Sequence, residues 1–568
     1  MTAQVRRLKK VFVKGGKVRK SRIIFSVLLV LALVVSAVAL VGCNGGNKPE
    51  EGQAESKKGG TLKFHINEPH TIDPYNAQES EGMQVTNALF DGLTAVDPIT
   101  SEIVPSVAES WEANDDATVW TFKLRPDTTF HNGDKVTAES FVYGWTRIAN
   151  IKTDEKNPSE IAYHLSAVKG FDKLQDGKAD VFEGLKAVDE NTLEVTLSYG
   201  FADFPAVVAH PALAPVPQAA VEADPAAFAA APVGNGPFKM EGKWEHDQYI
   251  KVTRFDDYYG EVANLDGVDF MIIDEIDTAY REFDAGNLDF TDIPLGRMKE
   301  AVEAYGQGEN FTTNPGKQVN ADPETSIYYL IMNNKEKTLK NQKVREAVSY
   351  AINREAIVET LFEGYRIPAT GVVPKGIVGY LDNQWPTSVY DVEKAKATLK
   401  EAGFEDGKGL PTLKLSFNTG GDHQNIMEMI QADLKAIGIK AELDSSEWAQ
   451  YLDALLAGDY QFGRLGWIAD YPIMDNFLYS NFETNAGDNR TGYSNAAFDK
   501  GVLEARSIVD EQERLAKYQE LERMIGETTP IAPIFYYAHN RVTSERVHNF
   551  IFSSANLASL ELCWVEGN

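Results

Sequence analysis

The sequence predicts an α/β protein that folds as more than one packed unit. Segments that alternate apolar and polar residues, as strands do, are interleaved along the body with segments that carry helical periodicity. A chain of 568 residues exceeds what one hydrophobic core accommodates. Its composition, with 43% hydrophobic and 10% aromatic residues, is that of a folded protein rather than a disordered one.

The N-terminus predicts export from the cytoplasm. A basic segment precedes Ile23–Val41, a long uncharged and mostly apolar stretch. The stretch leads into Leu-Val-Gly before Cys43, which resembles the lipobox of bacterial lipoproteins, whose cysteine receives a lipid. We therefore predict a signal peptide over 1–42, a lipid on Cys43, and a flexible tether over 43–59. An uncleaved transmembrane anchor is the alternative, and it also places the body outside the cytoplasm.

The first half of the body alternates short strands with helices. Thr61–Ile66 alternates apolar and polar residues and is followed by a proline, so it predicts a strand. Met83–Phe90 predicts a helix that ends before an Asp-Gly pair. Val119–Leu124 predicts a strand followed by a turn, and Thr137–Ile148 predicts a helix with its threonine as the N-cap. Thr192–Leu197 predicts another strand.

The second half continues the same alternation. Phe238–Phe255 follows an Asn-Gly-Pro turn and predicts paired strands. Tyr328–Met332 is a short apolar run that suits a buried strand, and Lys343–Glu363 predicts one long amphipathic helix. A β-α-β unit with a right-handed crossover follows, made of Leu413–Phe417, Gln424–Ala436 and Ile439–Leu443.

The charge balance argues against a nucleic-acid-binding protein. The formal net charge is −29, and every charged residue before Cys43 is basic, so the body alone is more acidic still. An anionic body repels a phosphate backbone, and solubility is sufficient to explain it. Cys43 and Cys563 are the only cysteines, which excludes a disulfide framework or a zinc cluster. We expect Cys563 to be a buried structural thiol.

No catalytic motif appears in the sequence. A nucleophile elbow, a Walker loop and an H-E-x-x-H helix are all missing. An EF-hand-like spacing that includes Asp176 and Glu183 fails at Leu174, whose side chain has no oxygen for calcium. We therefore predict no enzymatic activity, no cofactor and no metal site, with a secreted hydrolase on an α/β scaffold as the less favoured alternative.

Several segments together resemble one family. They are Val104–Trp111, Trp120–Arg125, Phe130–Asp134, Val136–Trp145, Asn235–Phe238, Val344–Ile352 and Gly466–Leu478. In this order they are similar to the extracytoplasmic oligopeptide- and dipeptide-binding proteins of ABC importers, from about Gly60 to the C-terminus. The combination is specific for the family and less specific for the ligand, since relatives bind dipeptides, nickel complexes, haem or sugars.

The resemblance implies a two-lobed fold of the periplasmic-binding-protein type II class. Lobe one would span 60–327 and carry an extra subdomain over about 91–204. Lobe two would span 328–536, and 537–568 would return to lobe one. Hinge strands are then expected near Ser326–Met332 and Pro533–Tyr537, with the ligand enclosed between the lobes when the hinge closes.

The resemblance also implies an amine-binding residue. In peptide-binding relatives the aspartate of the Gly-Trp-x-Ala-Asp-Tyr segment pairs with the ligand's α-ammonium, and here this residue is Asp470. A carboxylate in a dry cleft makes a strong charge-assisted bond to a free amino terminus. Gly466, Trp467 and Ile468 would offer backbone groups to the peptide, next to Tyr471. The alternative for Asp470 is a turn or helix-capping role.

Other positions are implied with alternatives left open. Arg464 lies where relatives use an arginine for a ligand carboxylate, although a structural ion pair would equally explain it. Trp448 and Trp467 resemble pocket walls or core residues. Gln78, Glu79 and Ser80 would lie on the lobe-one rim of the cleft or on an ordinary surface loop. Thr291 and Asp292 would also reach the ligand.

The sequence as a whole predicts a lipid-anchored, monomeric substrate-binding protein. It would capture extracellular peptides and deliver them to the permease subunits of an ABC transporter at the cell membrane. A metal chelate, haem or a glycan remains an alternative ligand for the same fold. A surface sensor for signalling peptides is also left open by the sequence.

Overall fold

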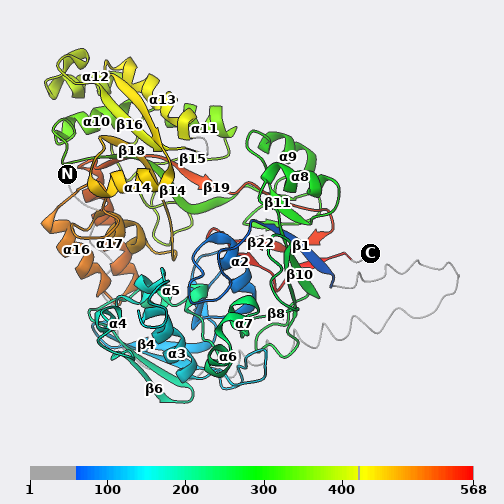
Figure 1. Ribbon diagram of the computed structural model, residues 1–568. Helices are drawn as coiled ribbons and strands as arrows, with labels where there is room; N and C mark the ends of the chain where they lie inside the picture. Colours follow the sequence, from blue (N-terminus) through cyan, green and yellow to red (C-terminus); the bar gives the residue numbers. More distant parts are fainter. Residues whose placement is uncertain (1–58, 420–422, 567–568) are drawn as a thin grey trace, which may run out of the picture. The chain divides into compact units, whose positions relative to one another are not determined.

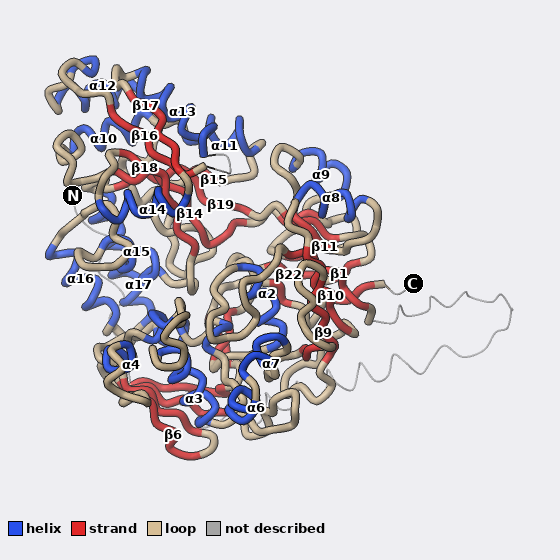
Figure 2. Tube along the Cα trace, in the orientation of Figure 1, coloured by secondary structure: helices blue, strands red, loops and turns tan. Residues whose placement is uncertain are grey.

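Three larger sheets organise the protein. The computed structural model describes residues 59–419 and 423–566 (Figure 1). The sheets have seven, six and four strands, with helices packed against them (Figure 2). This mixture of helix and sheet confirms the α/β prediction. The predicted signal peptide, Cys43 and all but the last residue of the predicted tether lie outside the described residues.

Lobe one is built on the seven-stranded sheet, whose strand order is β13-β20-β11-β1-β10-β9-β8. β1 (Thr61–Ile66) pairs in parallel with β10 (Gly267–Ile272), and Leu62 and Phe64 point into a core that also holds α2 (Ser80–Leu89). The predicted paired strands over Phe238–Phe255 are confirmed as two antiparallel neighbours, β8 and β9. The remaining main elements are β8 (Phe238–Met240), β9 (Tyr249–Arg254), β11 (Phe290–Asp292), β13 (Val319–Asn320), β20 (Arg541–Thr543), α8 (Ile276–Asp284) and α9 (Met298–Tyr305).

The subdomain is the part built on the four-stranded antiparallel sheet, in the order β4-β5-β7-β6. Helix α3 (Ala138–Ala149) packs on the subdomain core through Phe141 and Trp145, both fully buried. Its strands are β4 (Ala108–Ala113), β5 (Val119–Leu124), β6 (Leu185–Asp189) and β7 (Thr192–Thr196). Short helices are α4 (Phe171–Gln175), α5 (Phe204–Val207), α6 (Gln218–Ala223) and α7 (Pro225–Ala230), the last three C-terminal to this sheet.

Lobe two is built on the six-stranded sheet, in the order β15-β19-β14-β18-β16-β17. Helices α10 to α13 contribute to the core on one face, and α14 to α17 contribute to the core on the other face. The strands are β14 (Pro323–Met332), β15 (Ile367–Pro368), β16 (Leu413–Asn418), β17 (Ala441–Ser446), β18 (Phe462–Ile468) and β19 (Ile531–Ala538). The helices are α10 (Gln342–Ala351), α11 (Arg354–Phe362), α12 (Val392–Glu401), α13 (His423–Ala436), α14 (Trp448–Ala457), α15 (Met474–Phe482), α16 (Ala496–Arg506) and α17 (Glu511–Gly526).

Two predictions for lobe two have different outcomes. The β-α-β unit is confirmed, because β16 and β17 pair in parallel and α13 connects them. The single long helix over Lys343–Glu363 is wrong, because the chain forms α10 and α11 with a break between them. The break has a local cause: the Asn353 side chain accepts a hydrogen bond from the backbone N–H of Ala356 and so caps a new helix.

Two neighbouring strands carry the chain between the lobes. β14 enters lobe two and pairs antiparallel with β19, which leaves it, and both contain the predicted hinge segments. Immediately after β19, the backbone N–H of His539 donates to the carbonyl of Asp322, just before β14. The chain then forms β20 inside the lobe-one sheet. The exact lobe and subdomain boundaries stay a prediction.

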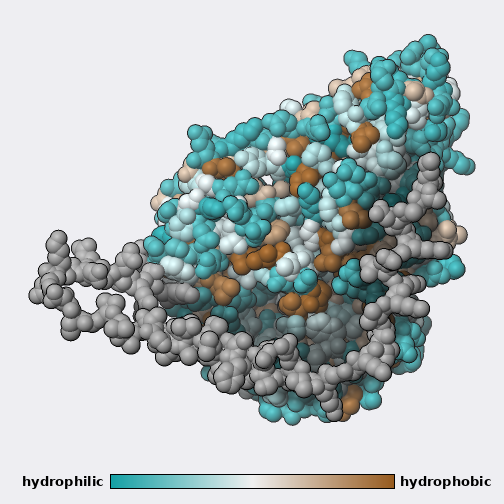
Figure 3. Space-filling model, turned by 180° about the vertical axis from the view of Figure 1, so that it is seen from behind, coloured by the Kyte–Doolittle hydropathy of each residue, from teal (hydrophilic) through white to brown (hydrophobic). Residues whose placement is uncertain are grey.

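The surface and the C-terminal segment complete the description. The face in Figure 3 is mainly hydrophilic, with hydrophobic residues in separate groups. Across residues 59–419 and 423–566, no helix combines the length and apolar character of a membrane span.

Cys563 is buried, as expected, and burial raises the pKa of its thiol. Short strands elsewhere are β2 (Thr94–Val96), β3 (Ile103–Pro105), β12 (Thr312–Thr313), β21 (Val547–His548), β22 (Phe550–Phe552), β23 (Ala558–Ser559) and β24 (Trp564–Val565).

Candidate ligand-binding site

The predicted backbone contacts lie on a strand with one partly unpaired edge. β18 pairs antiparallel with β14 over its whole length, with Tyr328 opposite Gly466. On its other side β16 pairs only with Phe462 and Gly463. Beyond these two residues, no strand in the described part of the chain pairs with that edge of β18. The edge therefore offers free hydrogen-bonding groups to an extended ligand.

The register determines which residues face this edge. Ala469 donates its backbone N–H to the carbonyl of Thr325, which sets the alternation of the ladder between β14 and β18. Trp467 therefore directs its backbone groups toward β14, while Gly466 and Ile468 direct theirs toward the open edge. A Cβ atom on Gly466 would lie 2.9 Å from the carbonyl oxygen of Ile327, which explains a glycine at this point.

Asp470 follows β18 and is half-buried, with both carboxylate oxygens held in place. Tyr163, in a short helix of the subdomain, donates its hydroxyl to Oδ1 at 3.0 Å. Asn476 donates its amide to Oδ2 at 2.8 Å. Among the described residues no lysine or arginine forms an ion pair with Asp470. Burial raises the pKa of the Asp470 carboxyl, and the bonds from Asn476 and Tyr163 act in the opposite direction.

Asn476 connects Asp470 to Trp467. Its Oδ1 accepts from the Trp467 indole N–H at 2.8 Å and from the Asp470 backbone N–H at 3.2 Å. The Trp467 side chain is half-buried against the core between β14 and α14–α17. Trp467 thus contributes to the site through the position of its indole, while the exposed Ile468 side chain (64% accessible) is free to meet a ligand.

Arg464 and Trp448 form a second group along the same sheet. The Arg464 Nε donates to Asn418 Oδ1 at 2.6 Å, and its guanidinium lies 5.1 Å from the centre of the Trp448 ring. Trp448 is 45% exposed, so it is not a core residue. No carboxylate of the described chain forms an ion pair with Arg464, which leaves its charge available to a ligand.

The lobe-one positions have diverse surroundings. Glu79 caps helix α2 by accepting a hydrogen bond from the backbone N–H of Gly82 at 2.9 Å. The same carboxylate oxygen also accepts from the backbone N–H of His70 in the preceding loop, at 2.9 Å. Gln78 and Ser80 on either side of it are exposed.

Thr291 and Asp292 lie on β11 within the lobe-one sheet. The Thr291 hydroxyl contacts His65 Nδ1 at 3.0 Å, and Asp292 forms an ion pair with Arg541. Both polar groups thus have partners within lobe one, whereas the strongest site features gather around Asp470.

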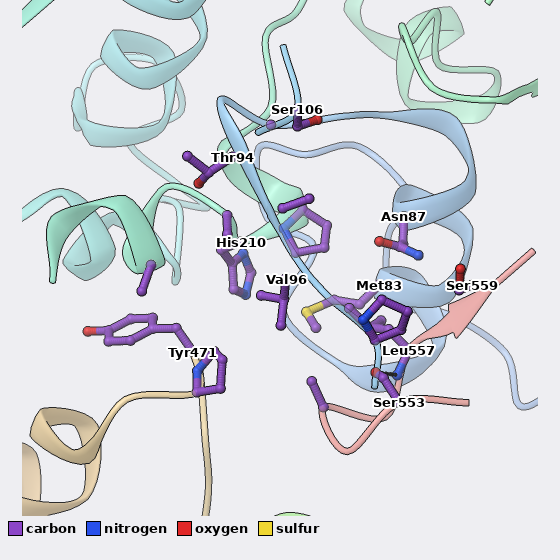
Figure 4. A pocket seen from close by; sticks show the side chains of 18 of the residues that line it. Met83, Asn87, Thr94, Val96, Ser106, His210, Tyr471, Ser553, Leu557 and Ser559 are labelled. Atoms are coloured by element: carbon purple, nitrogen blue, oxygen red, sulfur yellow. Dashed lines mark hydrogen bonds between the residues drawn. The ribbon is translucent and has the colours of Figure 1, made fainter. Parts of the chain in front are cut away.

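A cavity of about 160 Å³ adjoins Asp470. Figure 4 shows Met83 and Asn87 of α2, His210, Tyr471 after β18, and Leu557 of the C-terminal segment around it. Tyr471 also packs against the subdomain core. This volume is smaller than the roughly 300–1,000 Å³ of typical ligand pockets, so it suits one side chain rather than a whole peptide.

No metal site is evident in the described residues, where no group of three or more potential ligands gathers. Carboxylates of the EF-hand-like segment form ion pairs instead. Glu183 forms ion pairs with Lys169 and Lys173, each at 2.7 Å, and Asp176 forms one with Lys178. These carboxylates belong to surface ion pairs.

Sequence reasoning missed the two residues that hold the Asp470 carboxylate, as well as most of the residues that line the cavity beside it. Asn476 lies inside the segment Gly466–Leu478 that carries the family resemblance. Its position, only six residues after Asp470, could have indicated that the two side chains are close. Tyr163 is 307 residues away from Asp470 in the chain. No local pattern connects the two, so only the fold reveals their contact.

Comparison with known proteins identifies the family. The bacterial extracellular solute-binding proteins, family 5 (middle region), match residues 102–489. The chain belongs to this family. It is 31% identical over 541 residues to the oligopeptide-binding protein OppA of Bacillus subtilis (strain 168), covering 93% of this chain and 96% of the relative.

Solved structures of the family support the two-lobed fold. The unliganded open form of the periplasmic murein tripeptide-binding protein MppA aligns with a TM-score of 0.77 at 28% identity, covering 89% of this chain and 98% of MppA. Haemophilus influenzae OppA in complex with the peptide RPPGFSPFR aligns with a TM-score of 0.67 at 27% identity, covering 89% and 99%. This family 5 protein therefore has the type II fold of binding proteins, and its relatives are binding proteins rather than enzymes.

Proposed function

We propose that this family 5 protein captures extracellular peptides and delivers them to the permease of an ABC transporter. The observation that carries the proposal is Asp470, a half-buried carboxylate without a cationic partner among the described residues, next to the open edge of β18. Relatives with sequence matches along most of the chain are named for oligopeptide and dipeptide binding. A peptide supplies both features that this site lacks, an ammonium group and a strand-like backbone.

Binding would use groups that every peptide shares. The ligand's α-ammonium donates to Asp470, whose two oxygens each already accept one hydrogen bond and retain further acceptor capacity. The ligand backbone pairs with Gly466 and Ile468 along the open edge, so affinity does not depend on side-chain identity. Arg464 is available to a ligand carboxylate. The lobes then close over the ligand by bending β14 and β19.

The anchor and the partner belong to the same proposal. A lipid on Cys43 would hold the body at the outer surface of the cell membrane, close to the permease, and a monomer suits repeated delivery. Growth with a labelled fatty acid would test the anchor, because the label should enter the parent and not a Cys43→Ser variant. Equal labelling of both proteins would contradict lipidation at Cys43.

Two other functions receive less support. A non-peptide ligand on the same fold, such as a metal chelate, haem or a glycan, would leave the charge of Asp470 without a partner unless it carried an amine. A hydrolase has no positive observation in its favour. Multiple-turnover cleavage of peptides, followed by mass spectrometry, would establish a hydrolase.

The deciding experiment identifies what the protein carries. We would purify residues 60–568, unfold the protein mildly, and analyse released ligands by native mass spectrometry. A set of short peptides on the parent that is lost in Asp470→Ala is the expected result. A single non-peptide species on the parent would contradict the function, and peptides unaffected by the substitution would contradict the role of Asp470.

A further inference from the structure

Asn476 holds the candidate amine site together from inside the protein. Only 1% of the residue is accessible, and three of its hydrogen bonds lead to the site. Its amide N–H₂ faces the Asp470 carboxylate, while its Oδ1 accepts from Trp467 and from the Asp470 backbone. The two bonds to Oδ1 prevent the amide from turning over, so the donor must point at Asp470. The orientation of the carboxylate thus depends on the position of helix α15, which carries Asn476.

Helix α15 is fixed by the residue before Asn476. Asp475 is buried and accepts two hydrogen bonds from the Arg506 guanidinium, at 2.9 and 2.6 Å. Its Oδ1 also lies 3.2 Å from the Tyr518 hydroxyl. These contacts join the first turn of α15 to the end of α16 and to α17 within lobe two.

The same residues reach across to the subdomain. Arg514 Nε donates to Asp203 Oδ1 at 2.8 Å in a buried ion pair, and the Tyr518 hydroxyl lies 3.4 Å from Asp203 Oδ2. The backbone N–H of Ala202 donates to the carbonyl of Arg506 at 2.6 Å. We name this contact the clasp: Phe201–Asp203 on the subdomain side, and Asp475, Arg506, Arg514 and Tyr518 on the lobe-two side.

The subdomain side of the clasp is firmly attached to its own core. The Phe201 backbone N–H donates to the carbonyl of Ala117, and the Trp120 indole donates to the carbonyl of Phe201. On the lobe-two side, the Arg506 guanidinium lies 4.9 Å from the centre of the Phe201 ring. A movement of lobe two about β14 and β19 must therefore strain or break the clasp unless the subdomain moves with it.

We propose that Asn476 is a positioning residue for the amine-binding carboxylate and that the clasp holds Asn476 in place. Recognition of a peptide's amino terminus then depends on the contact between the subdomain and lobe two. The inference rests on the proposed function, and it adds residues that do not touch the ligand. Each link is a direct contact, from Asp203 through Tyr518 to Asp475, then along α15 to Asn476 and Asp470.

The test compares one peptide with its N-acetylated form, which lacks the ammonium. We define the ratio as the dissociation constant of the acetylated peptide divided by that of the free peptide. Measured by isothermal titration, this ratio reports the amine site alone. In Asn476→Leu the side chain keeps a similar volume but loses the hydrogen-bond donor to Asp470 without adding charge, and the ratio should fall roughly 10- to 100-fold.

Two clasp variants extend the test to the distant contact. Asp203→Asn keeps the shape but removes the charge that faces Arg514, and Tyr518→Phe removes only the bridging hydroxyl. Asp203→Asn should lower the ratio roughly 10-fold, and Tyr518→Phe should lower it several-fold. Neither residue contacts the ligand. Because Tyr518→Phe retains the packing of the ring, it keeps the test valid if Asp203→Asn does not fold.

A matched control and the opposing results complete the design. Glu520→Gln removes an exposed ion pair with Lys517 on the same helix and should leave the ratio unchanged. Clasp variants with a lower melting temperature but the parental ratio would overturn the inference, because that is the result of a purely structural contact. A parent that binds no peptide, or that binds both peptide forms equally, would overturn the proposed function instead.

Discussion

Glu522 makes the stability of lobe two dependent on pH. The residue lies on α17 and has no accessible surface. Its Oε1 accepts hydrogen bonds from the backbone N–H groups of Val372 and Val373, at 3.0 and 3.1 Å. Its Oε2 has no partner among the described residues. Burial raises the pKa of this carboxyl from 4.5 to about 7.

The sign and magnitude of the effect follow from the two pKa values. Below the unfolded value of 4.5 the carboxyl is neutral in both states, and its contribution to stability is fully present. As the pH rises toward the folded value of about 7, the unfolded chain releases its proton first, and stability is lost. A shift of this size corresponds to about 3 kcal/mol between about pH 4 and about pH 8.

Urea unfolding of residues 60–568 at several pH values would measure the effect. Glu522→Gln keeps the acceptor for Val372 and Val373 but cannot ionise. We expect the variant to gain about 3 kcal/mol relative to the parent as the pH rises from about 4 to about 8. Comparison at each pH cancels the other titrating groups. A difference between the two proteins that stays constant across this range would refute the reasoning.

Three further substitutions or reagents give measurable outcomes. Asp470→Asn should weaken binding of peptides with a free amino terminus about 100-fold, or about 3 kcal/mol, because the ammonium loses its counter-charge. Isothermal titration would measure this, and an unchanged dissociation constant would contradict it. Asp73→Asn should lower the free energy of unfolding by about 3 kcal/mol, because Arg147 would lose a buried two-bond partner at 2.7 and 2.6 Å. A loss below about 1 kcal/mol would argue against it. Cys563, the only thiol after residue 43, should react with iodoacetamide only after unfolding, and full alkylation of the native body would disprove the buried state.

Local elements could be predicted from the sequence because their signals are local. Thr61–Ile66 and Val119–Leu124 alternate in polarity, and the structure has strands with these same bounds. The helix predicted at Thr137–Ile148 begins one residue later, as expected when Thr137 is the cap. The error over Lys343–Glu363 arose because helical periodicity continues on both sides of Asn353. One capping side chain interrupted the backbone hydrogen bonds without interrupting the pattern.

In the candidate site, too, the local features could be predicted from the sequence and the long-range contacts could not. Gly466, Trp467, Ile468 and Asp470 lie in one short segment, so a resemblance over that segment could predict them together. Their roles depend on partners that the segment does not contain. The opening of the β18 edge depends on where β16 stops pairing. The carboxylate of Asp470 is held in part by Tyr163, which lies in a short helix of the subdomain.

The order of strands in lobe one bears on when the chain can fold if it is exported. β20 lies between β13 and β11, so the sheet that begins with Thr61 is completed only by Arg541–Thr543. A chain that crosses a membrane N-terminus first would have to deliver almost its whole length before this sheet could close. Sequence-distant pairing of this kind slows folding. The late strand would keep the emerging chain open for transport, and a product truncated before β20 would expose two strand edges to aggregation and proteolysis.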